Sequence, residues 1–199
     1  MTLGRMVGLA LALAALDSPL LAQQSGSDGE AFLNAVRDSN GGKAIELLSS
    51  RGSTVVNYRG YSGDAGLHIA ARRRDGQWLG FLLGKGADAN LADKNGDTPL
   101  IIVSRIGFDE GARILLAHRA KVDLGNRLGE TPLISAVQQR RPQTVRLLLE
   151  AGANPDKPDN AAGYSARDYA KQDRRSTESL RLIDSIKSTR KAIVGPSVK

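Results

Sequence analysis

The sequence contains no cysteine and few aromatic residues. The lack of cysteine excludes disulfide bonds, thiolate nucleophiles and cysteine-ligated metal sites. With hydrophobic residues at 41% and aromatic residues at 4%, the composition is globular but poor in the large side chains of one compact core. A series of thin stacked layers suits this composition better.

The motifs of common hydrolytic and nucleotide-binding sites are also missing. The sequence has no HExxH, no phosphate-binding GxxxxGK[ST] and no GxSxG segment. Its carboxylates, such as Asp93 and Asp97, fall in loops and at helix starts, where capping and solvation explain them. We therefore predict no catalytic residue, no metal site and no cofactor, and a protein that is not an enzyme.

Residues 1–22, MTLGRMVGLALALAALDSPLLA, are typical of a secretory signal peptide. They place one cation, Arg5, before an apolar run and end at the small residue Ala22. The run from residue 6 to 16 has 11 residues, about half of the roughly 20 that a membrane-spanning helix needs. We predict cleavage near Ala22, a flexible spacer at residues 23–29 and no membrane span in the mature chain. An uncleaved membrane anchor is the alternative.

The charge of the protein belongs to the part after this segment. Residues 1–22 hold one cation and one anion, Arg5 and Asp17, so the net charge of +7 is carried by the remainder. A basic surface of this kind favours acidic partners.

A segment of eight residues occurs twice, as NGDTPLII at 95–102 and as LGETPLIS at 128–135. Gly96 and Gly129 are 33 residues apart, and the register extends back to Gly63 and on to Gly163. Each of the two copies supplies a glycine for a turn, a threonine as N-cap and a proline at the first helical position. Leucine pairs recur later in each unit, at 82–83, 115–116 and 148–149. This period predicts a repeat array of short helix pairs.

The order of helix, tight turn, helix and finger loop, with TPL at the start and LLxxGA at the end, resembles the ankyrin repeat. The resemblance implies an all-α solenoid of about five helix–turn–helix units with finger loops. Its predicted domain spans 30–188 and is followed by a basic flexible tail at 189–199. The units are 30–62, 63–95, 96–128, 129–162 and 163–188, and the first and last depart from the pattern as caps do.

Two departures from the family pattern concern single positions. The histidine of the family's TPLH motif survives only at His68, which we interpret as structural, and apolar contacts are expected elsewhere. The family's glycine between the two helices is kept at Gly107 but replaced by Arg74, Arg140 and Arg174. If these turns keep φ > 0, each arginine adds about 1 kcal/mol of strain that another interaction would have to offset.

Two sets of residues are candidates for partner binding. Ankyrin proteins usually bind through the fingers and the concave helix face, so the resemblance points to finger residues expected to face solvent: Tyr58, Arg59, Tyr61, Leu91 and Leu124. The second set lies at the turns between helices, where stacking should align the cations into a ridge: Arg72, Arg73, Arg74, Arg105, Arg140, Arg141, Arg174 and Arg175. The alternative role of these cations is to complement helix dipoles and maintain solubility.

We predict a monomeric, non-enzymatic scaffold for protein–protein interactions, similar to exported bacterial ankyrin proteins and located in the periplasm. The absence of any Asn-x-Ser/Thr acceptor agrees with a bacterial compartment, and secretion or membrane anchoring are the alternatives. The partner is a protein, acidic if it docks on the ridge. A nucleic acid is not expected, because no aromatic stacking platform accompanies the cations. Two alternative functions are a module for polyanions or anionic membrane surfaces and an immunity-type inhibitor of one toxin or enzyme.

Overall fold

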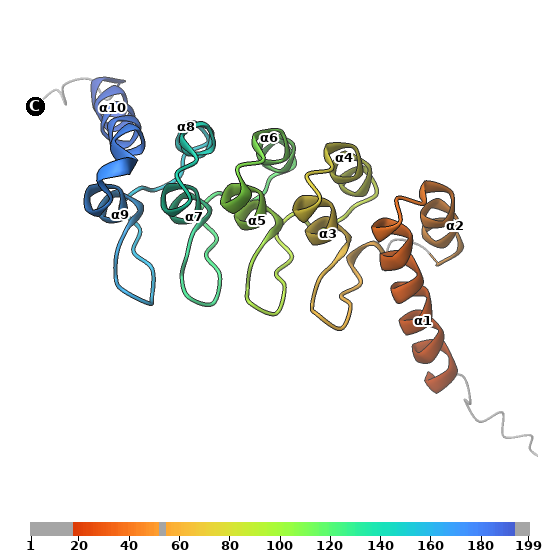
Figure 1. The fold of residues 1–199 in the computed structure, drawn as a ribbon. Coiled ribbons are helices and arrows are strands. Elements are labelled where there is room, and N and C mark those ends of the chain that lie inside the picture. Colours follow the sequence, from red (N-terminus) through yellow and green to blue (C-terminus); the bar gives the residue numbers. More distant parts are fainter. Residues whose placement is uncertain (1–17, 52–54, 194–199) are drawn as a thin grey trace, which may run out of the picture.

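A computed structural model of the chain describes residues 18–51 and 55–193. Within these ranges the protein is helical and contains no strand; one isolated antiparallel bridge joins Pro158 to Ser165. The helices follow one another in pairs with a finger loop between pairs (Figure 1). The predicted all-α ankyrin-repeat solenoid is confirmed.

The helices form two rows, and the fingers project to one side at a steep angle to them (Figure 1). The helices are α1 (Ser18–Arg37), α2 (Gly41–Arg51), α3 (Gly66–Arg72), α4 (Gly76–Gly84), α5 (Pro99–Ile106), α6 (Asp109–Ala117), α7 (Pro132–Gln138), α8 (Pro142–Glu150), α9 (Ala166–Gln172) and α10 (Thr177–Ile193). Two short 3-10 helices are η1 (Val55–Asn57) and η2 (Arg174–Ser176). Helices α3, α5, α7 and α9 form the row from which the fingers descend, and α4, α6, α8 and α10 form a second row on the side away from the fingers (Figure 1).

The repeated TPL segments start helices as predicted. The hydroxyl of Thr98 accepts a hydrogen bond from the backbone N–H of Ile101 at 3.3 Å, and Thr131 caps α7 in the same way. Helix α3 has Ala65 as its N-cap, and here His68 acts instead: its Nδ1 accepts from the N–H of Ala65 at 3.0 Å. A cap is therefore kept where the threonine is lost, although its geometry is reversed.

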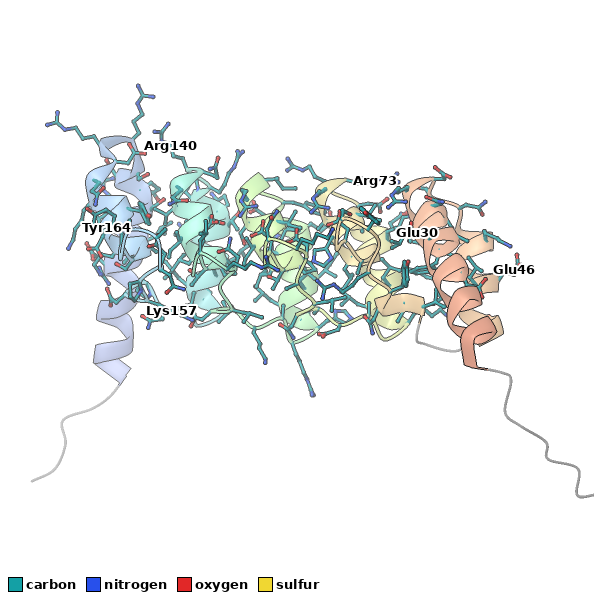
Figure 2. All side chains as sticks on the ribbon, turned by 90° about the horizontal axis from the view of Figure 1, so that it is seen from below. Glu30, Glu46, Arg73, Arg140, Lys157 and Tyr164 are labelled. Carbon is teal, nitrogen blue, oxygen red and sulfur yellow. The ribbon has the colours of Figure 1, made fainter. Side chains whose placement is uncertain are left out.

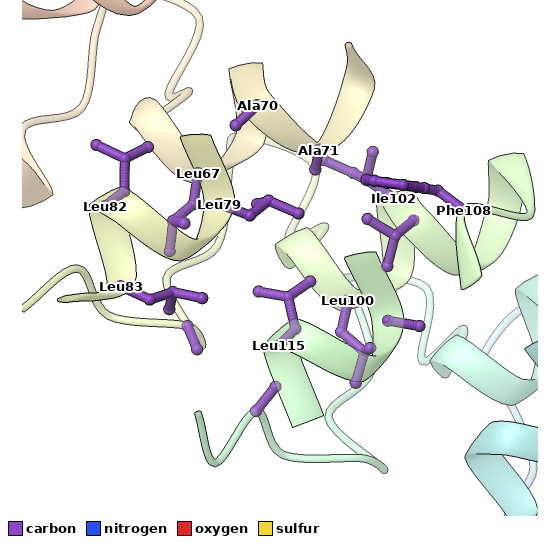
Figure 3. Packing of buried hydrophobic residues seen from close by; sticks show 14 of the residues in the cluster. Leu67, Ala70, Ala71, Leu79, Leu82, Leu83, Leu100, Ile102, Phe108 and Leu115 are labelled. Carbon is purple, nitrogen blue, oxygen red and sulfur yellow. The ribbon is translucent and has the colours of Figure 1, made fainter. Parts of the chain in front are cut away.

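The core is a row of thin layers. Leu82, Leu115 and Leu148 occupy equivalent positions in α4, α6 and α8, and each is fully buried. Figure 3 shows two such layers, with Leu82 of α4 near Leu67 of α3 and Leu115 of α6 near Leu100 of α5. Each helix pair thus buries its apolar faces against the next pair, as expected of a repeat protein.

The fingers stack through their backbones. Arg127 N–H donates to the carbonyl of Asn95 at 3.2 Å, and Asn160 N–H donates to that of Leu128 at 2.8 Å. Gly96 has φ +83°, and a Cβ there would lie 2.6 Å from the nitrogen of Arg127. Glycine is required for two reasons, the left-handed backbone and the close approach of the next finger.

The N-terminal part differs from the prediction. Residues 23–29, expected to be a flexible spacer, lie within α1. The helix extends to this point against the first finger, since the ring of Tyr58 covers Gly29 so closely that a Cβ on Gly29 would lie 2.3 Å from its Cγ. Most of the predicted signal peptide, residues 1–17, lies outside the described residues. No helix in the described part is long and apolar enough to cross a membrane.

The C-terminal part differs in a similar way. Residues 189–193 of the predicted flexible tail form the end of α10, and residues 194–199 lie outside the described residues. Leu182 and Ile183 of α10 are buried in the core, so the helix covers the last layer of the array. This position is typical of a capping element.

Candidate protein-binding surface

The tips of the first three fingers form an exposed surface of mixed chemistry. Tyr61 is 94% exposed, and the Nζ of Lys94 on the next finger lies 4.9 Å from the centre of its ring. On the third finger, Arg127 is exposed and Leu128 is 59% exposed. We call these four residues the fingertip surface. Aromatic, aliphatic and cationic groups in one place are the composition of protein interfaces.

A pocket of about 400 Å³ opens beside this surface, between the second and third fingers. It is lined by Lys94, Asn95, Asp97, Arg105, Asn126, Arg127, Leu128 and Glu130. Arg105 bonds Asp97 at 2.6 Å and Glu130 at 3.0 Å, and so ties two units together. The pocket therefore combines cationic and apolar walls with a fixed ionic network.

The ionic network holds its carboxylate in the charged form. Burial opposes ionisation of Asp97, but hydrogen bonds from Arg105 and Asn126 outweigh it and lower the pKa of Asp97. The hydrogen bond to Asp97 raises the pKa of Arg105, although burial opposes this shift. Asp97 and Arg105 thus stabilise the fold through their bonds to each other. A partner would contact the side chains of the fingertip surface instead.

The predicted finger residues have different surroundings. Tyr61 is exposed as expected, and so is Arg59, whose Nε donates to the carbonyl of Gly63 at 3.4 Å. Leu91 and Leu124 are half-buried. The assignment of these residues to partner binding stays a prediction.

Tyr58, which was expected to face solvent, is half-buried. Its ring lies on Gly29 of α1, and its hydroxyl lies 3.4 Å from Glu30 Oε1. Burial, followed by the charge of Glu30, raises the pKa of Tyr58. The sequence predicts a spacer at residues 23–29 and therefore no element beside the first finger.

Two arginines of the predicted ridge lie instead on the finger side of the helices. Arg72 bonds Asp64 at 2.7 Å and Asp93 at 3.1 Å. One unit later Arg105 makes the equivalent pair with Asp97 and a different second pair, with Glu130. Both lie in the last turn of a helix in the row from which the fingers descend, before the turn that joins the two helices of the pair. These two cations link neighbouring fingers. They do not belong to the edge formed by the turns between paired helices, which we call the turn edge.

The arginines of the second unit's turn bind neighbouring turns. Arg73 donates to the carbonyls of Val36, at 3.1 Å, and Arg37, and to the hydroxyl of Ser39 at 2.7 Å. Arg74 donates forward to the carbonyl of Gly107 at 3.1 Å. These long side chains connect three successive turns.

The expected left-handed conformation occurs at Arg74 and Arg140, with φ of 57° and 54°. It does not occur at Arg174, which lies in η2. Helix α9 ends at Gln172, and its C-cap residue Asp173 is extended, with φ −92°, so the following residues start a new turn instead of completing the family's glycine turn. The proposed strain therefore applies to two of the three arginines.

The turn edge is cationic at its two ends. Figure 2 places Arg73 and Arg140 along the same edge of the solenoid, as predicted for aligned turns. Between them, Asp109 and Glu110 form the first turn of α6 and interrupt the series. Arg141 lies toward this interruption, with its Cδ against Gly107. The edge thus has two separate cationic ends.

Three residues of the fingertip surface share one position of the repeat and could have been predicted from the sequence. Tyr61, Lys94 and Arg127 each stand two residues before a repeat glycine, at Gly63, Gly96 and Gly129. The predicted finger residues include Tyr61 but neither Lys94 nor Arg127. Comparing equivalent positions across units would have identified all three tips.

Stacked helix pairs, aligned fingers and repeated caps define a helical repeat protein. A family model described as ankyrin repeats, with three copies, matches residues 67–159. These residues are ankyrin repeats, which form a protein–protein interaction module. No curated protein sequence matches the chain.

Proposed function

We propose that the protein is a non-enzymatic, exported scaffold that binds a protein partner through the fingertip surface. The observation that carries this proposal is the exposure of Tyr61 and Leu128 beside Lys94 and Arg127. An exposed aromatic ring of this kind buries a large area on binding without loss of many rotamers. The cations favour a partner segment in which acidic residues flank an apolar side chain.

The periplasm is the proposed compartment, with Ala22 as the end of the signal peptide. The sequence pattern of residues 1–22 and the absence of cysteine support it. Intact-mass measurement of the protein from its native host tests cleavage: a mature chain starting near Gln23 is expected. A chain that still carries Met1 would favour the membrane-anchored alternative.

Affinity capture tests the binding surface. Wild-type protein and a double Tyr61→Ala, Leu128→Ala variant are used to capture partners from a periplasmic extract. Loss of both side chains should weaken binding by more than about 1 kcal/mol if they are anchors. Ile45→Ala is the matched control, since Ile45 is 47% exposed but lies on α2, away from the fingers.

Equal recovery of the partner by wild type and the double variant would remove the fingertip surface from the interface. The captured protein also separates the scaffold from an immunity-type inhibitor. An enzyme or toxin that loses its activity in the complex would favour the inhibitor.

A further inference from the structure

A second exposed group of charges lies at the C-terminal end of the turn edge. We call it the cationic corner, formed by Arg140, Lys171, Arg174 and Arg175 around the carboxylate of Asp173. All four cations are exposed. They outnumber the carboxylates near them, which are Asp173, Asp168 beside Lys171 and Glu178 at the start of α10. The corner is therefore net positive, in contrast to the acidic turn at Asp109 and Glu110.

Asp173 organises the corner. Its Oδ2 accepts from Arg140 Nε at 2.7 Å and from the hydroxyl of Ser176 at 3.1 Å, and its Oδ1 accepts from the backbone N–H of Arg175 at 2.9 Å. The hydrogen bond from Arg140 is the main reason that the pKa of Asp173 is lowered. Because this bond uses Nε, the two terminal nitrogens of the Arg140 guanidinium lie outside the ion pair, and the side chain is 50% exposed.

The 3-10 turn η2 fixes the next two arginines. Thr177 donates from its hydroxyl to the carbonyl of Arg174 at 2.9 Å, while Asp173 holds the N–H of Arg175. No ion pair of Arg174 or Arg175 is seen among the described residues. Their backbone is held while their charges are available, so binding would order the two side chains without also ordering a loop.

A pocket of about 420 Å³ lies between the ends of α7 and α9, and of the four cations Arg140 is the one that lines it. Its lining comprises Val137, Gln138, Arg140, Tyr169, Gln172, Asp173 and Ser176. The pocket has room for a side chain, and the two glutamines supply amide donors that suit a carboxylate.

We propose that the cationic corner is a second docking site, which takes an acidic segment of a protein with several neighbouring carboxylates. Arginine pairs carboxylates through two parallel N–H donors, and several such cations favour a segment over a single acid. The pocket provides depth that a flat surface such as a membrane cannot use. A nucleic acid lacks a stacking partner here, because Tyr169 is half-buried and its hydroxyl is bound to Asp159 at 2.6 Å.

The test measures binding of a labelled oligoglutamate peptide to the full chain by fluorescence anisotropy. The variant is Arg174→Glu with Arg175→Glu, which leaves the Arg140–Asp173 pair in place. The matched control is Arg113→Glu with Arg146→Glu, the same charge change at exposed positions on α6 and α8. Reversal in the corner should weaken binding by about tenfold or more, and the control by about twofold, because charge attraction is screened over about 8 Å at physiological ionic strength. Wild-type binding should also weaken as salt is raised.

Equal loss of peptide binding in the two charge-reversed variants would overturn the proposal, because it would show an effect of net charge alone. Anionic lipid vesicles or a single-stranded oligonucleotide that bind the corner while the peptide does not would overturn it as well. The result is independent of the fingertip surface: the Tyr61→Ala, Leu128→Ala variant should bind the peptide like wild type. Loss of the native partner without loss of the peptide would thus separate the two surfaces.

Discussion

Arg74 donates a hydrogen bond from Nη2 to the carbonyl of Gly107, one repeat further along the chain, at 3.1 Å. Its guanidinium also lies 5.7 Å from the centre of the Phe108 ring. From the following repeat, the side chain of Arg141 covers the same glycine, and a Cβ on Gly107 would lie 2.6 Å from its Cδ. The hydrogen bond and the cation–π contact together offset the left-handed strain of about 1 kcal/mol at Arg74.

This arrangement predicts the effect of Gly107→Ala. The backbone at Gly107 has φ +69°, and the added methyl group meets Arg141, so unfolding free energy should fall by about 1–2 kcal/mol. Arg141→Ala in the same chain should recover the part that comes from the collision. Urea unfolding of the two single variants and the double variant measures this coupling. If the changes in unfolding free energy are additive, the Arg141 side chain moves aside without an energetic cost.

Truncation of buried leucines should destabilise the whole array. Leu115 is fully buried in the middle of the stack, so Leu115→Ala should lower the free energy of unfolding by about 2–5 kcal/mol. The neighbouring Leu116 is only partly buried and is the matched control. Thermal or urea unfolding would contradict the layered core if Leu116→Ala were as harmful as Leu115→Ala.

His68 should make stability depend on pH below neutrality. Burial lowers its pKa from the ordinary 6.5, and Arg72 acts in the same direction, while Asp64, Asp93 and the carbonyl of Asp97 oppose it. The unfolded chain gains a proton at His68 below about pH 6.5 while the folded chain does not, so stability decreases as pH falls through this range. It levels off only below the folded-state pKa.

The same histidine has a clear structural reason to resist protonation. Its Nδ1 accepts from the Ala65 N–H, so its Nε2 carries the proton and donates to the carbonyl of Asp97 at 3.1 Å. Unfolding of wild type and His68→Gln at about pH 7.5 and about pH 5.5 measures the effect. At the higher pH, His68→Gln should be less stable than wild type. Its stability should also differ much less between the two pH values than that of wild type. A slope that persists unchanged in His68→Gln would assign it to other groups.

Asp97 should be important for the junction of the second and third fingers. It is 5% exposed and accepts from Arg105 and Asn126, so Asp97→Asn should cost about 1–3 kcal/mol by breaking a buried charge pair. Asp88→Asn is the control, since Asp88 is exposed in a finger and should change stability by less than about 0.5 kcal/mol. Because the pKa of Asp97 is lowered, its contribution is present above the ordinary pKa of 3.8 and is lost as pH falls below it. Similar losses in both variants at neutral pH would contradict the role of Asp97.

The sequence predicts what depends on local signals. Thr98 and Pro99 identify a helix start because the cap and the proline act within one turn. The sequence did not predict the surroundings of Tyr58 or the backbone conformation of Arg174. Tyr58 is covered by a segment distant in sequence, and Arg174 follows a helix whose end is set by the capping unit instead of the repeat.

The sequence also did not predict the direction in which long side chains point. Arg72 and Arg74 are two residues apart, yet one reaches the fingers and the other the next turn. Composition shows that both are cations, but their direction depends on the helical phase and on acceptors that stacking supplies. The sequence therefore predicted the alignment of the turns better than the charge that remains exposed there.

The histidine link described above differs from the arginine link in what it demands of the neighbouring repeat. His68 bonds a main-chain carbonyl at Asp97, which every residue type possesses, whereas Arg105 bonds the side chain of Glu130. A repeat grafted in after residue 95 would preserve the first link whatever amino acid it carried at that site. A repeat grafted in after residue 128 would need an acidic residue in the place of Glu130. The two junctions therefore differ in how freely repeats can be exchanged, by recombination or by engineering, without loss of the contacts between them.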